Sequence, residues 1–126
     1  MAERTRPAPT DRFDAAIIDF DLGKQLDALR NEPKPVRHGH RQKTLFKHGG
    51  RTIALFSLDP GGWLHEHAAQ GLVAIHCVEG HIAVQTEASR LEIHAGGLLV
   101  LTPGERHSVE GISTSAFLLH VCLDAH

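Results

Sequence analysis

The chain has 126 residues, of which 41% are hydrophobic and 22% charged, and its formal net charge is −2. These totals are typical of one globular domain. Without a basic excess no nucleic-acid-binding surface is expected, and no apolar run approaches the roughly 20 residues of a membrane-spanning helix. The first residues lead into no apolar signal region, so we predict a cytoplasmic location.

The N-terminal part of the chain predicts an arm followed by one short helix. Residues 1–14 are rich in Pro and in mixed charges, which favours a flexible arm. The apolar segment 15–20 is either an edge strand or the lead-in to a helix. Asp21 then offers a side-chain cap, and a helix over 22–31 is predicted by three leucines at the spacing of one helical face, Leu22, Leu26 and Leu29.

The pattern changes at Lys43, where short apolar or alternating runs become separated by Gly, Pro, Asp and Ser turns. The candidate strands are Lys43–Lys47, Thr52–Leu58, Leu72–Val78, His81–Thr86, Arg90–His94, Leu98–Leu101, His107–Glu110 and Ser115–Leu123. Regularly spaced short strands predict an all-β sandwich or barrel, and their lengths fit a double-sheet jelly roll. We therefore expect residues 43–126 to form a barrel and residues 1–42 to form an arm and helix packed on it.

Both cysteines, Cys77 and Cys122, lie inside apolar strand-like runs. In a reducing compartment such residues behave as small hydrophobic side chains. We therefore expect two buried thiols and no disulfide.

A pair of histidines precedes one of these strands. His65 and His67 are one residue apart. Because residues i and i+2 of a strand point to the same face, the pair can aim two imidazoles at one point. His107, after the Thr-Pro-Gly turn, offers a third ring. A second such pair, His38 and His40, lies in a loop among Arg and Lys residues, whose charge disfavours a cation there.

With these motifs the chain resembles the small single-domain cupins, which are RmlC-like jelly rolls of the cupin 2 type. The resemblance covers about Lys43 to Leu123 and rests on two segments, Gly62…His65-Glu66-His67…Gly80 and Gly96…Pro103-Gly104…His107. It implies a double-stranded β-helix barrel with a short N-terminal helix and a metal site at the barrel mouth. The metal ligands that it implies are His65, His67 and His107.

The first motif departs from the family pattern at its carboxylate. Seven residues before Gly80, where the family usually carries Glu, stands Val73, which has no ligand atom. Gln70 is the nearest polar candidate for a fourth ligand, and His120 is a weaker one. Glu66 should point away from its two neighbouring histidines. The resemblance therefore supports the fold more strongly than the activity.

Three neutral imidazoles can hold a divalent transition metal and leave a position open for water or substrate. Zn, Fe, Ni, Mn and Cu all stay open as its identity. One hypothesis is accordingly a metal-dependent enzyme, oxygenase-like or isomerase-like, that acts on a small molecule. The alternative is a non-catalytic cupin that binds or senses a small ligand, with or without metal. The substrate is not predicted.

Apolar residues near the histidines predict a small-molecule pocket with a few polar groups. We expect it to be lined by Trp63, Val73, Ile75 and Arg106, of which Trp63 is equally suited to the core or to a subunit interface. Arg106 can hold a carboxylate substrate or point into solvent. Exposed strand edges in barrels of this type favour edge pairing, so a homodimer is expected.

Overall fold

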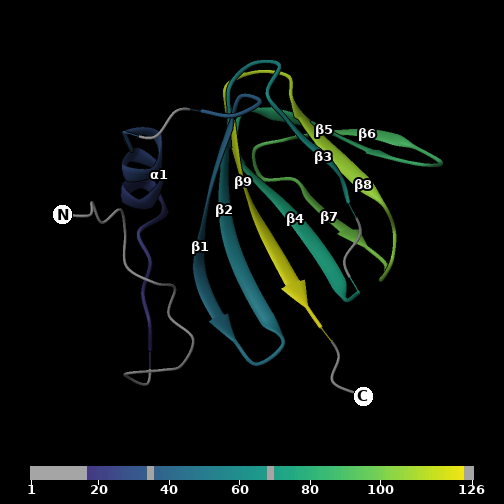
Figure 1. Cartoon of the computed structure of the whole chain (residues 1–126), viewed down its shortest axis with the longest axis horizontal. Coiled ribbons are helices and arrows are strands. Elements are labelled where there is room, and N and C mark those ends of the chain that lie inside the picture. The colour runs from purple at the N-terminus through teal and green to yellow at the C-terminus, as the bar shows by residue number, and fades with distance from the viewer. Residues whose placement is uncertain (1–16, 34–35, 68–69, 124–126) are drawn as a thin grey trace.

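The computed structural model describes residues 17–33, 36–67 and 70–123, except for the side chains of Glu66 and His67. These residues form one helix and nine strands, arranged as two antiparallel sheets that face each other (Figure 1). In chain order they are α1 (Leu22–Arg30), β1 (His40–His48), β2 (Arg51–Leu58), β3 (Trp63–His67), β4 (Leu72–Glu79), β5 (His81–Thr86), β6 (Arg90–His94), β7 (Leu98–Leu101), β8 (His107–Gly111) and β9 (Ser115–Cys122).

Sheet A has the order β1-β2-β9-β4-β7, and sheet B has the order β3-β8-β5-β6. Alternating side chains from both sheets form the core between them. At its centre the rings of Phe56 on β2 and Phe117 on β9 stack with their centroids 4.8 Å apart. The core cluster contains Ala54, Phe56, Leu58, Val73, Ile75, Cys77, Ile82, Val84, Leu101, Val109 and Phe117.

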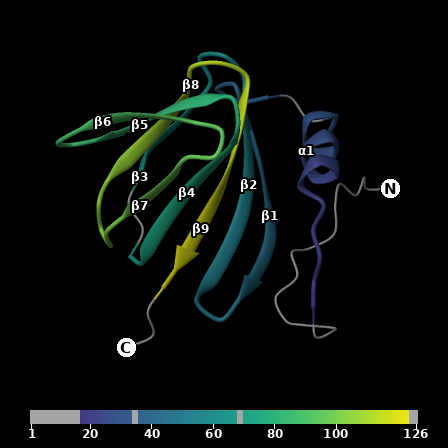
Figure 2. The same cartoon turned by 180° about the vertical axis from the view of Figure 1, so that it is seen from behind.

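Helix α1 covers part of the outer face of sheet A. It begins where the Asp21 carboxylate accepts a hydrogen bond from the Lys24 backbone N–H at 3.1 Å, which satisfies a donor of the first turn. Its buried residues, Leu26 and Leu29, pack on Leu55 and its neighbours in a second core cluster. Both views place the helix beside β1 and β2, away from β4 and β7 (Figures 1 and 2).

The C-terminal end of the helix is tied to sheet A by Arg30. Its Nη1 lies 3.0 Å from a carboxylate oxygen of Glu79, and its Nη2 donates to the carbonyl of Ser115 at 3.3 Å. Both side chains of the ion pair are partly exposed, so the pair orients the helix more than it stabilises the fold.

Most of the expected elements are confirmed with small shifts of their ends. The helix and all the candidate strands occur, and residues 17–20 of the apolar segment before the helix form no strand. The exception is β3, which the strand pattern did not include. Its five residues, Trp-Leu-His-Glu-His, lack an apolar alternation, and they become a strand by pairing with β8. Among the described residues no helix has the length and apolar character that a membrane crossing requires.

Candidate functional site

The site is organised by a bulge in β3. Leu64 pairs with Val109 on β8, and the next pair is His67 with His107. Over this interval β3 therefore contains one residue more than β8. A bulge of this kind changes the facing of the side chains that follow it. The regular register of β3 is therefore interrupted between Leu64 and His67.

His65 lies on the outer face of β3. Leu64 packs against the core, and the His65 ring instead contacts Trp63 edge to face, with centroids 4.4 Å apart. The ring of His38 lies 4.5 Å from Trp63 and 5.7 Å from His65. His65 is exposed and Trp63 retains 36% of its accessible surface. Three aromatic rings are thus grouped outside the barrel: two come from β3, and the third, His38, comes from a segment that is distant in sequence.

Two glycines allow the segment with His38 to approach β3. A Cβ on Gly62 would meet the carbonyl oxygen of Gly39. Gly39 itself has a positive φ of +69°, which glycine adopts without strain. The close contact is held by the Trp63 backbone N–H, which donates to the His38 carbonyl at 2.9 Å. His40 adds a contact from its Nδ1 to the Trp63 carbonyl at 3.1 Å. Both residues of this second His-x-His pair therefore contact Trp63.

His107 has the opposite environment. It is 1% exposed and lies two residues from Val109, on the face of β8 that points into the core. Its Nδ1 lies 3.3 Å from the carbonyl oxygen of Glu105. If Nδ1 carries the proton and donates to that carbonyl, the lone pair is on Nε2.

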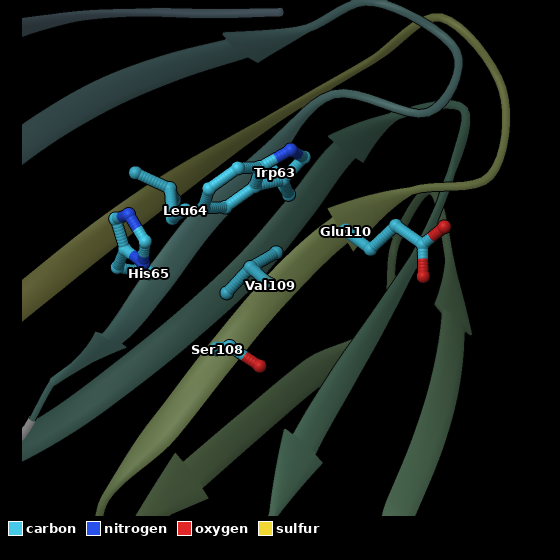
Figure 3. A pocket seen from close by; sticks show the side chains of 6 residues that line it. All are labelled: Trp63, Leu64, His65, Ser108, Val109 and Glu110. Carbon is cyan, nitrogen blue, oxygen red and sulfur yellow. The ribbon is translucent and has the colours of Figure 1, made fainter. Parts of the chain in front are cut away.

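A surface pocket of about 480 Å³ lies across the paired strands β3 and β8 (Figure 3). It is lined by Trp63, Leu64, His65, Ser108, Val109 and Glu110. Trp63 and Glu110 are direct cross-strand partners, so their side chains share the outer face. The pocket combines an aromatic wall with a hydroxyl, an imidazole and a carboxylate.

Comparison with solved structures identifies the architecture. A protein of unknown function from Streptococcus pyogenes has a TM-score of 0.71 at 18% identity, over 95% of this chain and 98% of that chain. A cupin superfamily protein from Desulfitobacterium hafniense has a TM-score of 0.70 at 15% identity, over 97% of this chain and 100% of that chain. The chain has the cupin fold.

A third similar structure is an RmlC-like cupin from Shewanella frigidimarina, with a TM-score of 0.66 and 15% identity over 74% of this chain and 84% of that chain. No family model and no curated protein matches the sequence. The expected jelly-roll cupin architecture is therefore confirmed by structural similarity.

Within this fold the expected site residues whose side chains are described lie in different surroundings. His65 is outside the barrel and His107 is inside it, while the backbone of His67 stands opposite His107 and its side chain lies outside the described residues. Val73 and Ile75 are 3% and 0% exposed and belong to the packed core. Among the described residues no group of three or more His, Cys, Asp or Glu side chains is arranged to hold a metal ion.

The two remaining expected residues lie at the surface. Gln70 is exposed in the bend before β4, and Arg106 is exposed in the turn before β8. The described side chains thus do not form the implied three-histidine set. The metal site stays a prediction, because the His67 side chain is outside the described residues.

Sequence reasoning did not find Ser108, Glu110 and His38. Ser108 and Glu110 alternate with His107 and Val109 in a predicted strand, so their common face was readable. Their position next to Trp63 was not readable, because it depends on the pairing of β8 with β3.

The outer face of sheet B is polar around the pocket. Arg90 Nη1 lies 3.6 Å from a Glu110 carboxylate oxygen, and Arg90 Nη2 lies 4.0 Å from Glu92. His81 Nε2 contacts Glu92 at 2.9 Å, and its ring stacks on His94 with centroids 4.0 Å apart. All these groups are at least partly exposed, so their pairwise energies are small. They set a mixed charge pattern beside the pocket.

Proposed function

We propose that this cupin is a small-molecule-binding protein whose ligand occupies the pocket between β3 and β8. The observation that carries the proposal is the grouping of Trp63, His65, Ser108 and Glu110 around a cavity of about 480 Å³. Small-molecule sites commonly combine an apolar or aromatic wall with a few polar groups that fix orientation. This function corresponds to the ligand-binding, non-catalytic alternative.

The side chains define the chemistry of the ligand. Trp63 offers a flat apolar surface, and an aromatic face favours a ring or a cationic group packed on it. The Glu110 carboxylate accepts hydrogen bonds, while the Ser108 hydroxyl donates or accepts. The ligand is therefore a small polar compound with one flat or apolar side and at least one hydrogen-bond donor, such as a sugar or an amine.

Tryptophan fluorescence tests this proposal directly, because Trp63 is the only Trp in the chain. A panel of monosaccharides, amino acids and alkylamines is titrated while emission and the thermal midpoint are followed. We expect one class to shift both signals in the native protein and to lose its effect in Glu110→Gln. Glu92→Gln is the matched control, since Glu92 shares the outer face but does not line the pocket.

A thermal-midpoint shift that survives in both Glu110→Gln and Trp63→Phe, the second of which no longer has the fluorophore, would place binding elsewhere. Absence of any response across the panel at millimolar concentration would count against the proposal.

A divalent metal on the inner side of β3 and β8 is the second candidate. It is favoured by His107, whose buried ring contacts the Glu105 carbonyl through Nδ1, since metal-binding histidines commonly direct their second nitrogen to a carbonyl. His67, opposite in register, is the one partner from the predicted set. The exposed His65 and the apolar Val73 do not complete it.

Elemental analysis separates the two candidates. Protein prepared without chelators is compared with His107→Ala and with His94→Ala, a histidine on the outer face of sheet B. Near-stoichiometric metal that is lost only in His107→Ala supports the second candidate. A metal content below about a tenth of an equivalent per chain rejects it, because a complete ligand set would bind close to one equivalent.

A further inference from the structure

A second, smaller pocket lies outside the barrel, where the C-terminal end of α1 meets the start of β1 and the end of β2 (Figure 1). Its volume is about 240 Å³, compared with about 480 Å³ for the pocket between β3 and β8. Drug-sized ligands occupy roughly 300–1,000 Å³, so this pocket suits a smaller molecule. Its polar and charged lining consists of Arg30, His40, Arg41, Ser57, Asp59 and Thr114.

Arg41 enters the pocket from the outer face of sheet A. It pairs with Ser57 on β2, and Ser57 pairs in turn with Ala116 on β9, which packs in the core cluster beneath α1. The three residues therefore share the face that the helix covers. The Arg41 side chain is half-buried, and within the part of the chain that the structure describes its guanidinium group makes no hydrogen bond or ion pair. Its donors are accordingly open to a ligand.

The second guanidinium group of the pocket is already engaged. Arg30 forms the ion pair with Glu79 at 3.0 Å and donates to the carbonyl of Ser115 at 3.3 Å. Its charge is therefore offset by a neighbour outside the pocket lining. The positive charge that a ligand would meet is that of Arg41.

The pocket also carries a carboxylate, that of Asp59. The Asp59 backbone N–H donates to the Gly39 carbonyl at 2.8 Å, which fixes this residue beside the segment that leads into β1. Asp59 and Arg41 line the same pocket, yet between these described residues there is no ion pair. Two opposite charges that face one cavity without contact attract a ligand that carries both charges.

We propose that this pocket binds a small zwitterion, namely an α-amino acid with a short side chain. Its carboxylate pairs with the Arg41 guanidinium, whose planar fork matches that group, and accepts a hydrogen bond from the Ser57 hydroxyl. Its ammonium group lies toward Asp59. A simple anion would be repelled by Asp59, and a simple cation by Arg41. The short side chain follows from the volume and from the small apolar lining, Val36 and Gly39.

Isothermal titration calorimetry with L-alanine and L-serine tests the proposal, with propionate and ethylamine as the single-charge probes. We expect one of the amino acids to bind at one equivalent and at least about tenfold more tightly than either single-charge probe. Arg41→Gln should weaken that binding by about 10- to 100-fold, the range for a hydrogen-bonded charge. Lys43→Gln is the matched control, because Lys43 lies two residues further along the same face of β1 and contacts Gln25 of α1 outside the pocket.

Two further variants locate the ligand. Asp59→Asn should lower the affinity for the amino acid to that for propionate, whereas Glu110→Gln, in the pocket between β3 and β8, should leave it unchanged. Circular dichroism confirms that each variant is folded. If Arg41→Gln fails to fold, Arg41→Lys replaces it, since lysine keeps the charge and loses the planar fork.

The proposal is overturned if neither amino acid binds at millimolar concentration, or if propionate or ethylamine binds as tightly. It is also overturned if Lys43→Gln or Glu110→Gln weakens binding as much as the Arg41 variant does.

Discussion

His120 on β9 lies beside His76 on β4, and both rings are on the outer face of sheet A. Directly opposite His120 stand two uncharged residues, Ala74 on β4 and Ile53 on β2. Partial burial is the main reason why the pKa of His120 is lowered, and the charge of His76 adds to it. Protonation of His120 is therefore harder in the folded chain than in the unfolded chain.

This relationship predicts that acid destabilises the fold. Below the ordinary His pKa of 6.5 the unfolded chain binds a proton that folded His120 resists, so stability falls as pH falls through that value. Above it both states are neutral and the contribution is constant. Urea titrations from pH 5 to 8 should show a smaller loss in His120→Leu than in the native chain, while His94→Leu should match the native chain. An equal loss in His120→Leu would contradict the assignment.

A second prediction concerns two glycines with the same backbone conformation and different surroundings. Gly80 and Gly96 have φ of +79° and +93°. A Cβ on Gly80 would meet the Thr114 carbonyl oxygen, whereas nothing lies within 4 Å of one on Gly96. Gly96→Ala should cost roughly 1–2 kcal/mol from left-handed strain alone. Gly80→Ala should cost clearly more in chemical denaturation, and equal costs would show that the contact is relieved easily.

Thiol reactivity should differ between the two cysteines. Cys77 is 0% exposed, and burial raises its pKa, so little thiolate is present near pH 8. Cys122 is only partly buried. Iodoacetamide should modify at most one thiol in the native protein and two in denaturant, as read by intact mass. In Cys122→Ser the native protein should remain unmodified, and rapid labelling of that variant would contradict the buried position of Cys77.

The N-terminal cap of α1 can be tested by one substitution. Asp21→Ala removes the acceptor for the Lys24 backbone N–H and should cost about 1 kcal/mol in thermal or urea unfolding. Asp19→Ala is the control, because Asp19 is exposed and precedes the helix. A cost shared by both variants would point to net charge rather than to capping.

The strands and the helix were predictable because their signals are local. Gly and Pro turns separate the apolar runs, and the leucine stripe of α1 appears at its helical spacing. The parity of β4 is also readable from its sequence, because Val73, Ile75 and Cys77 alternate with Ala74 and His76, and the first three are in the core. The parity of β9 is not readable in this way, because both of its faces carry apolar residues: Phe117 is in the core, and Leu118 packs with α1.

The site was less predictable because it depends on contacts between distant segments. The His-x-His spacing predicts one shared face for His65 and His67 in a regular strand, but a bulge interrupts the register of β3 between Leu64 and His67. A bulge leaves no composition signal in a five-residue strand. The approach of His38 to Trp63 likewise rests on two glycines, Gly39 and Gly62, that are far apart in sequence.

The β3 bulge has a consequence for how this chain can vary in length. A regular strand responds to the loss of one residue by turning every later side chain to the opposite face. Here β3 has one extra residue between Leu64 and His67, which has no partner on β8. A deletion at that point would restore a regular register and keep His67 opposite His107. Descendants of this chain could therefore lose a residue there and retain the barrel lining, whereas a deletion within β8 would reverse it.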